Sequence, residues 1–526
     1  MPSKPVKLYI LKDIDYNAVI AEYRKLCREG ISHYDDRDFS VYESKPSPVI
    51  VDKEPREPLK DNTRIRNKAV FLMHTIIYRQ QTSKENEQEG GTLQAHVLQS
   101  ILGKDYFEIL KAFENLGYVE RTSTYVIGKS SKRHIAKGET GTEPCTNMTI
   151  IKYILHSKEL LDEEITKRLA SPRFKQEYGD GFAETYIKNL NKFKIKNLKD
   201  FKDFASDKIK NNPDTEAYYD FIQESFKSKL KIYSIDSNNR IYHILTSLKR
   251  ELKQYINIRY SIDCSNSHPL LFNYFIYLNK KIPIKNSFSI SYILSLISSS
   301  TISSTSSGIF HYDIQYLRNA LIDNGVEKSK LARLEDDELL YLWKTTTGVF
   351  WDDILAAHQE EGFDRAEIKR KMFGEVFYSK TPKIAWKTFA KEFKEQYPNV
   401  YELILRWKEP QYYESMKKVL LRHNKAVVIN GMTLIDNTET ALPNLMMDLE
   451  STIFREILKS LFRKRICCVH IHDAIVVPDV KSTEKVEANK IQEVMRDVYK
   501  GFGLHPTFKV ERYDGNAPTI PAEASS

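Results

Sequence analysis

Apolar and polar positions follow different patterns in different regions of the chain. Residues 1–60 are polar and interrupted by proline, which predicts an N-terminal arm or a loosely packed subdomain. Residues 61–145 begin with helical apolar periodicity over 64–79, and two short helices and a pair of strands are expected to follow. Gly117 stands where the second short helix is expected to end. That helix has apolar residues at positions i, i+3, i+4 and i+7, namely Tyr106, Ile109, Leu110 and Phe113.

This order of helices and paired strands predicts a winged-helix-like module. The tip of its strand pair is basic, with Gly128 at the turn and Lys129, Lys132, Arg133 and His134 after it. Two interpretations are open. Either this tip contacts phosphates, or the module only packs against other parts of the chain or a protein partner.

The remaining pattern predicts a mostly helical α+β fold. Residues 146–237 form a lysine-rich helical region, and residues 238–526 alternate strand-like and helical segments. Within the latter, residues 286–308 are rich in serine, which predicts a loop.

The composition adds a basic charge and no targeting signal. Lys and Arg number 80 against 71 Asp and Glu, a formal charge of +9, which is compatible with a polyanionic partner without requiring one. The N-terminal residues lack an apolar core of signal-peptide length, and no stretch approaches the about 20 apolar residues of a membrane span. The five cysteines form no CxxC pair. Reduced thiols, a cytoplasmic location and no membrane partner are therefore expected.

Two aspartates stand at the ends of apolar strands. In residues 465–480 two β-branched runs flank His472 and Asp473, which predicts a tight hairpin with the aspartate at its turn. Earlier, an apolar strand leads to Asp263, and the chain then turns into a helix. A carboxylate between apolar strands is costly unless a cation neutralises it, although Asp473 alone is more simply explained as a turn-capping residue. Together, two such carboxylates are suited to hold two Mg²⁺ ions for nucleotidyl transfer.

A stripe of cations and aromatics lies between these two segments. Arg365, Lys369, Phe373 and Phe377 recur at every fourth position, so they share one face of a predicted helix. A nucleoside triphosphate along that face would meet cations at its phosphates and rings at its base and sugar. Taken alone, the stripe is more simply an amphipathic helix with buried rings and solvated cations.

Taken together, these segments resemble motifs A, B and C of the family A polymerases, the group of bacterial DNA polymerase I. The single-subunit phage-type RNA polymerases share the same palm. A segment at 238–252 resembles the TGR-type segment that precedes motif A, and the whole resemblance covers roughly residues 240–515. The matching residues are Arg240 in the TGR-type segment, Asp263 and Ser265 in motif A, Arg365, Lys369, Phe373, Gly374 and Phe377 in motif B, and His472 and Asp473 in motif C.

The resemblance implies a right-hand polymerase fold. It places an antiparallel palm sheet and helical fingers in residues 238–526, with the fingers at 335–425, and a thumb-like region at 146–237. The implied activity is DNA-directed DNA synthesis without a proofreading domain. Template, primer and nucleoside triphosphates would be its partners and two Mg²⁺ ions its cofactors, with Mn²⁺ as an alternative. A phage or other mobile element, in replication or defence, would suit such an enzyme, and its N-terminal half offers room for a protein partner.

The resemblance also implies a role for each matching residue. Asp263 and Asp473 would hold the metals with the Cys264 carbonyl, and Lys369 would also protonate the departing pyrophosphate. The remaining implied roles are triphosphate binding by Arg365 and Lys369, packing on the incoming nucleotide by His268, Phe373 and Phe377, and holding of the primer end by Arg240 and His472.

Three positions depart from the family pattern. His268 stands where the DNA enzymes carry a sugar-gating Glu, Phe377 replaces the motif B Tyr, and Ala474 replaces an auxiliary Glu. A bulky His268 and the loss of a hydroxyl at Phe377 both favour deoxynucleotides. In the helix before motif C, Asn444 and Glu450 are the polar candidates for template contact.

Three alternatives stay open. The first is an RNA polymerase or a primer-independent polymerase on the same palm. The second is a non-catalytic DNA-binding protein of replication or defence with a degenerate palm. A metal-dependent nuclease is the weakest, because Asp52 and Glu54 are its only further acidic pair.

Overall fold

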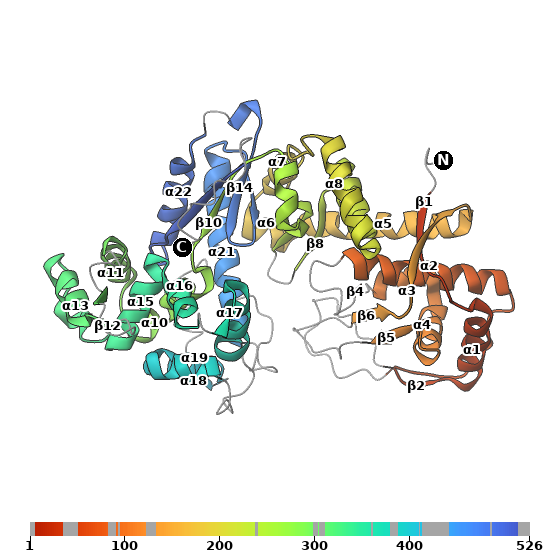
Figure 1. Cartoon of the computed structure of the whole chain (residues 1–526), viewed down its shortest axis with the longest axis horizontal. Helices are drawn as coiled ribbons and strands as arrows, with labels where there is room; N and C mark the ends of the chain where they lie inside the picture. The colour runs from red at the N-terminus through yellow and green to blue at the C-terminus, as the bar shows by residue number, and fades with distance from the viewer. Residues whose placement is uncertain are drawn as a thin grey trace. The chain divides into compact units, whose positions relative to one another are not determined.

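The computed structural model describes two compact units (Figure 1), divided between Asn257 and Ile258. Both contain helices and small antiparallel sheets, and helix predominates, which confirms the predicted α+β class. None of the helices within the described ranges combines the length and the apolar composition needed to cross a membrane. The described residues are 6–34, 51–82, 91–92, 95–121, 133–236, 240–297, 303–304, 311–358, 361–378, 388–409, 411–412, 441–483 and 486–513.

The first unit begins with a strand and a helix that belong to its main core. Its elements are β1 (Val6–Leu11), α1 (Tyr16–Glu29), β2 (Ile31–Tyr34), β3 (Val51–Lys53), α2 (Asn62–Thr82), β4 (Gly91–Thr92), α3 (Ala95–Leu102), α4 (Tyr106–Asn115), β5 (Val119–Arg121), β6 (Arg133–Ala136), β7 (Thr140–Cys145), α5 (Met148–Leu169), α6 (Pro172–Tyr178), α7 (Phe182–Leu190), α8 (Leu198–Asn211), α9 (Glu216–Lys227), β8 (Ile232–Ile235) and β9 (Ile241–His243).

The N-terminal segment is better ordered than its polar composition predicts. Strand β1 pairs antiparallel with β7 over its whole length, and α1 buries Val19, Tyr23 and Leu26. These side chains join one apolar cluster with α2, α3 and α4. An arm was expected over residues 1–60, but long-range pairing with β7 and burial against α4 hold the described parts of it in the core.

Residues 62–136 have the element order that the sequence predicts for a winged helix. Helix α2 is followed by β4, α3, α4, β5 and β6, and β6 lies between β4 and β5. Gly117 ends α4 with a φ of 76°, and the backbone N–H groups of Gly117 and Tyr118 donate to the carbonyls of Glu114 and Phe113. Most of the predicted basic tip, including Gly128, Lys129 and Lys132, lies outside the described residues. His134 is buried, so it does not contribute to an exposed basic tip.

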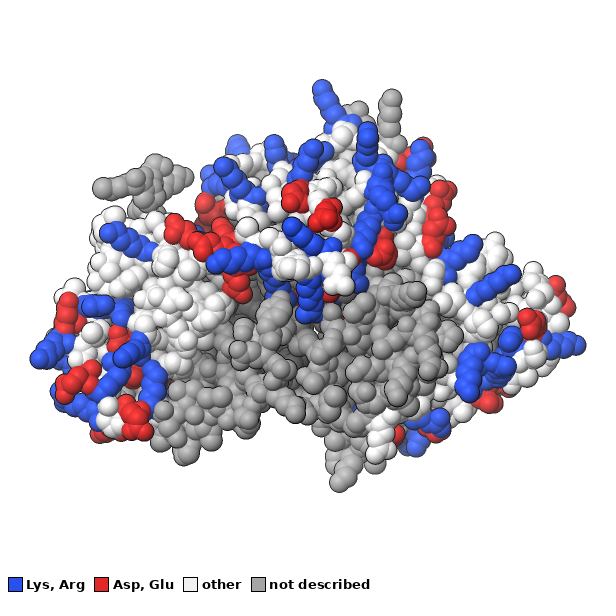
Figure 2. Space-filling view, turned by 180° about the vertical axis from the view of Figure 1, so that it is seen from behind, with Lys and Arg blue, Asp and Glu red and all other residues white. Residues whose placement is uncertain are grey.

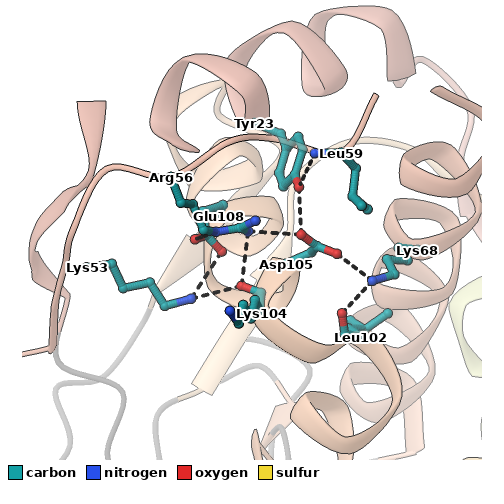
Figure 3. Close-up of polar contacts among 9 residues, drawn as sticks. All are labelled: Tyr23, Lys53, Arg56, Leu59, Lys68, Leu102, Lys104, Asp105 and Glu108. Atoms are coloured by element: carbon teal, nitrogen blue, oxygen red, sulfur yellow. Dashed lines mark hydrogen bonds and ion pairs between the residues drawn. The ribbon is translucent and has the colours of Figure 1, made fainter. Parts of the chain in front are cut away.

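Helix α4 is covered by α1 and by the segment before α2. Figure 3 shows Arg56 and Tyr23 converging on the acidic residues at the start of α4. Arg56 donates from Nε to Glu108 Oε1 at 3.0 Å and from Nη2 to Asp105 Oδ1 at 2.9 Å. Lys68 donates to the other oxygen of Asp105. Burial alone raises the pKa of Asp105, but hydrogen bonds from Lys68, Tyr23 and Arg56 outweigh it and lower that pKa overall.

This buried ionic network leaves α4 without an exposed face. Every residue from Asp105 to Glu114 is buried or half-buried. Lys53 adds a further bond to Glu108, at 3.1 Å, and lies over the Phe107 ring. In this conformation the side chains of α4 are covered by α1 and the segment 53–59, so they are not free to reach base edges in a groove. The structure therefore favours packing over base reading for this helix.

Replacing Asp105 with asparagine is expected to destabilise the protein by about 3–5 kcal/mol, because Lys68 would be left buried without a carboxylate partner. Urea unfolding followed by circular dichroism measures this loss. The matched control is Glu120→Gln, which removes an ion pair with Lys137 whose side chains are both about half exposed, and should cost less than about 1 kcal/mol. Equal losses in the two variants would contradict a stabilising role for the buried ionic network around Asp105.

The helices after β7 carry a basic surface. Side-chain caps fix the starts of α5, α6 and α8, such as Asn147 before α5 and Asn197 before α8. Residues 188–210 contain eight lysines and three aspartates, and seven of these lysines are exposed. Figure 2 shows Lys and Arg side chains crowding the upper part of the face that it displays. The exposed lysines of this segment are Lys188, Lys194, Lys196, Lys199, Lys202, Lys208 and Lys210.

The second unit is built on a four-stranded antiparallel sheet in the order β13, β14, β10, β15. Helices α10 and α21 pack against one another beside it, and α22 packs on α21 and β10. Its elements are β10 (Ile258–Cys264), α10 (Ser267–Asn279), α11 (Ile284–Leu296), β11 (Ser303–Ser304), β12 (His311–Tyr312), α13 (Ile314–Asp323), α14 (Lys328–Leu331), α15 (Asp336–Thr347), α16 (Phe350–Ala357), α17 (Arg365–Met372), the π-helical turn Phe373–Phe377, α18 (Thr388–Gln396), α19 (Pro398–Trp407), α21 (Ala441–Arg463), β13 (Val469–Ile471), β14 (Ala474–Pro478), α22 (Ala488–Lys500) and β15 (Phe508–Arg512).

The serine-rich segment is helical where a loop was predicted. Helix α11 extends through residues 284–296, and the rest of the segment lies mainly outside the described residues. Ser287 and Ser289 donate to carbonyls three and four residues earlier in the same helix. Their hydroxyls therefore do not draw the backbone into a non-helical conformation, as serine hydroxyls often do. Ile290 and Leu294 are buried on one face. Apolar spacing therefore outweighs the serine composition here.

Candidate active site

Strand β10 and the β13–β14 hairpin bring the two predicted aspartates together. Asp263 is the register partner of Ala474, the residue after Asp473, across the β10–β14 ladder. The Cys264 N–H donates to the Asp473 carbonyl at 3.2 Å. The predicted hairpin is confirmed, and His472 has a φ of 52°, the left-handed conformation that a two-residue hairpin turn needs. Two segments more than 200 residues apart therefore place carboxylates at neighbouring positions of one sheet.

Burial and neighbouring negative charges disfavour the ionised form of Asp473. Burial raises the pKa of Asp473 well above its usual value, and the nearby charges of Asp263 and Glu450 raise it further, while Lys369 opposes them. A cation at this position would relieve the repulsion, and a hard oxygen donor set suits Mg²⁺. Within the described residues, no group of three or more His, Cys, Asp and Glu side chains is arranged to hold a metal ion. Two aspartates would therefore need phosphate oxygens and water to complete the coordination of Mg²⁺.

Helix α17 carries the predicted lysine, whose charge interacts with these carboxylates. A capping box between Asp364 and Glu367 fixes the start of the helix. Lys369 is half-buried, with Nζ 5.7 Å from the centroid of the Trp351 ring. Burial lowers the pKa of Lys369 and the charge of Arg365 lowers it further, whereas both aspartates of the carboxylate pair raise it. The ammonium of Lys369 therefore interacts electrostatically with the carboxylate pair.

Arg365 is more exposed than Lys369. Its guanidinium forms an ion pair with Asp352 at 3.3 Å on the surface of the second unit. Surface pairs of this kind contribute little to stability, so the guanidinium remains available to a triphosphate.

The second half of the predicted stripe is shifted by a π-helical turn. Residues Phe373–Phe377 form this turn, and the Tyr378 N–H donates to the Phe373 carbonyl, five residues earlier, at 2.7 Å. Phe377 is completely buried, with its ring 6.2 Å from that of Phe272 and 6.0 Å from that of Phe393. Phe377 is therefore a core residue in this conformation, and its packing on an incoming nucleotide stays a prediction. Tyr378 takes the half-buried position instead and stacks on Phe373, with ring centroids 5.1 Å apart.

His268 connects this aromatic pair to α21. Its Nδ1 forms a hydrogen bond with the Tyr378 hydroxyl, and its Nε2 lies 3.2 Å from Glu450 Oε1. Ser267 donates to the same Glu450 oxygen at 3.1 Å. The His268 ring meets the Phe373 ring edge to face at 5.6 Å. The polar and aromatic groups beside the carboxylate pair are thus held by bonds from three separate helices.

Comparison with known proteins adds no family. No protein-family model and no curated protein matches this chain.

The remaining predicted residues occupy separate places. His472 is exposed at the hairpin turn beside Asp473. The Cys264 thiol is buried and accepts a hydrogen bond from the Tyr499 hydroxyl at 3.5 Å, so its side chain serves packing. Arg240 lies in the first unit, at the start of β9, where its N–H donates to Asp236 Oδ1 at 2.9 Å. Its role at a primer end stays a prediction.

Sequence reasoning missed Tyr378 and Trp351 and left the role of Glu450 open. Tyr378 comes one residue after Phe377, which helical spacing places on the face of Phe373. Only the π-helical turn brings Tyr378 to that face. Glu450 was one of two polar candidates on its helix, and its bonds to α10 distinguish it. Asn444 has no described side-chain surroundings.

Proposed function

We propose that this protein is a template-directed nucleic-acid polymerase, with DNA-directed DNA synthesis as its favoured activity. The observation that carries the proposal is the adjacency of Asp263 and Asp473 on β10 and the β13–β14 turn. The charges of both aspartates also raise the pKa of Lys369 on α17. Nucleotidyl transfer requires a pair of carboxylates that hold divalent cations and a lysine that binds the triphosphate. These residues would supply both. The sequence resemblance to family A polymerases supports the same activity.

Each group then has a chemical role. Asp263 and Asp473 would hold two Mg²⁺ ions, which supply a more acidic 3′-hydroxyl and charge neutralisation on the departing pyrophosphate. Arg365 and Lys369 would bind the triphosphate. A lysine whose pKa is lowered by burial is also a better proton donor to pyrophosphate near neutral pH than an ordinary lysine. The exposed lysines of 188–210 would contact template or primer phosphates.

The contacts of His268 favour deoxynucleotides. A Tyr hydroxyl is present after all, on Tyr378, but His268 already bonds to it and Glu450 holds His268 from the other side. A 2′-hydroxyl at this place would meet a bulky ring and a hydroxyl that is engaged elsewhere. A deoxyribose avoids that steric and polar conflict.

Replacing His268 with alanine is expected to raise the use of ribonucleotides relative to deoxynucleotides by about tenfold, because the change removes the ring and releases the Tyr378 hydroxyl. Competition between ATP and dATP for one primer terminus measures the ratio. Tyr378→Phe, which keeps the ring and removes the hydroxyl, separates the polar from the steric contribution. An unchanged ratio in His268→Ala would show that this residue does not select the sugar.

Primer extension with separate nucleotide sets tests the function itself. The protein is incubated with a labelled primer on a DNA template, Mg²⁺ and either deoxynucleotides or ribonucleotides, beside a reaction without primer. We expect extension with deoxynucleotides on the primed template. Extension by ribonucleotides alone, or synthesis only without a primer, would overturn the preference for DNA synthesis. No incorporation with any set would overturn the polymerase proposal and favour a non-catalytic DNA-binding role.

A further inference from the structure

One aromatic and one aliphatic side chain are exposed on α11 of the second unit, beside a half-buried phenylalanine. Leu296 and Tyr292 are 65 % and 45 % exposed, and Phe288, one turn before Tyr292, is half-buried. These three residues recur at every fourth position, so they lie along one face of α11. An exposed apolar stripe of this kind is unusual for a surface helix and indicates a binding role.

The rings of this stripe are held in a defined arrangement with His505. The rings of Phe288 and Tyr292 are nearly parallel, at 19°, with centroids 6.1 Å apart. His505 meets Tyr292 at 5.2 Å and Phe288 at 6.0 Å. Burial and the charge of Arg496 both lower the pKa of His505. These three rings form one cluster, and Tyr292 is exposed within it.

One lysine lies over a ring of this cluster and a second is one turn away on α11, and the chain around α11 contains no acids. Lys500 at the end of α22 places Nζ 5.1 Å from the centroid of the Phe288 ring. Lys285 is exposed one turn before Phe288 on the same helix. Residues 280–312 contain three lysines and no Asp or Glu. We call Lys285, Phe288, Tyr292, Lys500 and His505 together the α11 ring surface.

The α11 ring surface is attached to the strand that carries Asp263. Ser291 donates to the Gly503 carbonyl at 3.2 Å, which joins α11 to the segment containing His505. Two residues after His505, the Thr507 carbonyl accepts a hydrogen bond from the Ser265 N–H at 2.9 Å. Ser265 is itself two residues after Asp263. A short, hydrogen-bonded path therefore joins the ring surface to one of the two aspartates.

We propose that the α11 ring surface binds single-stranded nucleic acid, the unpaired part of a template strand. Bases of any identity stack on aromatic faces, and lysines between the rings meet the phosphates, which is the general chemistry of single-strand binding. A protein partner would call for a larger apolar area and for acidic groups opposite the lysines on that partner, whereas the mixture of rings and cations matches a polynucleotide directly. The assignment of the strand as template rests on the proposed polymerase function, but single-strand binding itself does not.

Binding of a labelled single-stranded oligothymidylate, followed by fluorescence anisotropy, tests this surface. Tyr292→Ala is expected to weaken binding about tenfold, because one exposed stacking ring is lost. Lys500→Gln should reduce the salt dependence of binding, since one phosphate contact is lost. Tyr316→Ala is the matched control, because Tyr316 is 41 % exposed on α13 and lies outside the ring surface. Thermal melting of each variant shows whether the fold is retained.

A second comparison separates this inference from the polymerase proposal. Asp473→Asn should bind the oligothymidylate as the wild type does, whatever its catalytic activity. With a long template overhang, Tyr292→Ala should extend primers less efficiently than the wild type, and with a single unpaired template nucleotide the two should be equal. Binding that depends on Tyr292 in a protein that extends no primer would overturn the polymerase proposal and keep the ring surface. Equal binding by Tyr292→Ala, Tyr316→Ala and the wild type would overturn the proposal that the α11 ring surface binds single strands. Self-association of the wild type that Tyr292→Ala abolishes would also overturn it, because the surface would then bind a second copy of the chain.

Discussion

Replacing Asp473 with asparagine is expected to abolish nucleotide incorporation while raising the thermal stability of the metal-free protein. The wild-type carboxylate is partly buried beside Asp263 and Glu450, and all three influences raise its pKa. An uncharged amide of the same size removes that repulsion, so the melting temperature should rise by a few degrees. Incorporation should fall by about three orders of magnitude or more, because one of two metal-holding groups is lost.

The dependence of stability on pH and on Mg²⁺ gives two further tests of Asp473→Asn. Because folding raises the pKa of Asp473, the native state holds its proton more tightly than the unfolded state does. The stability of the metal-free wild type should therefore decrease as pH rises above the unfolded pKa of about 4, and Asp473→Asn should lose part of this dependence. Mg²⁺ should stabilise the wild type more than the variant.

The exposed Asp497 on α22 offers a matched control for this charge change. Asp497→Asn removes one negative charge from the same unit without altering the carboxylate pair. It should retain wild-type incorporation and wild-type stabilisation by Mg²⁺. Incorporation by Asp473→Asn at the wild-type rate would contradict the two-metal account.

Replacing Lys369 with methionine is expected to reduce the rate of single-turnover incorporation by about 10²- to 10³-fold. Methionine keeps the length of the side chain beside Trp351 but removes both the charge on the triphosphate and the proton donor. The neighbouring Arg370, whose side chain is 72 % exposed, provides the control variant Arg370→Gln. Equal rates for the two variants would exclude Lys369 from the reaction.

The pH dependence of the rate distinguishes the two roles of Lys369. Burial lowers its pKa, so the wild-type rate should begin to fall at a lower pH than an ordinary lysine would give, as the ammonium loses its proton. Lys369→Arg keeps the charge but has no titration in this range, so its rate should be low and should lack that alkaline decline. Single-turnover rates between pH 6 and the alkaline limit of protein stability test this difference.

The aspartates were predictable from the sequence because local pattern determines their positions. A run of β-branched residues, a sharp turn and a second run define the hairpin around Asp473 without any distant contact. The same holds for Asp263 at the end of β10. Their adjacency required only that the two strands pair, and the resemblance to family A polymerases already implied this.

The shifted stripe was not predictable, because it depends on one extra residue in a helical turn. Spacing of four assigns Phe377 to the face of Phe373, whereas the π-helical turn buries Phe377 and brings Tyr378 into that place. In the structure Phe377 packs against Phe272, more than 100 residues earlier, and against Phe393 on α18, and spacing alone does not reveal either contact. A tyrosine hydroxyl is therefore present beside Phe373 after all, on Tyr378, one residue after Phe377.

The N-terminal segment and α11 were missed for related reasons. The polar composition of residues 1–60 conceals β1, whose pairing partner β7 lies more than 120 residues away. In α11 the serines suggested a loop, but their hydroxyls bond within the helix and the apolar residues between them keep helical spacing. Composition predicts loops poorly where local hydrogen bonds satisfy the polar side chains, as they do for the serines of α11.

Sequencing of extension products on templates that differ at one base tests the central claim most directly. The purified protein receives a primed DNA template, all four deoxynucleotides and Mg²⁺, and the base opposite the first added nucleotide is varied through its four identities. The two-aspartate polymerase account predicts that the first added nucleotide changes with the template base and is complementary to it. An added nucleotide that is independent of the template base, or no added nucleotide with active, folded protein, would contradict it.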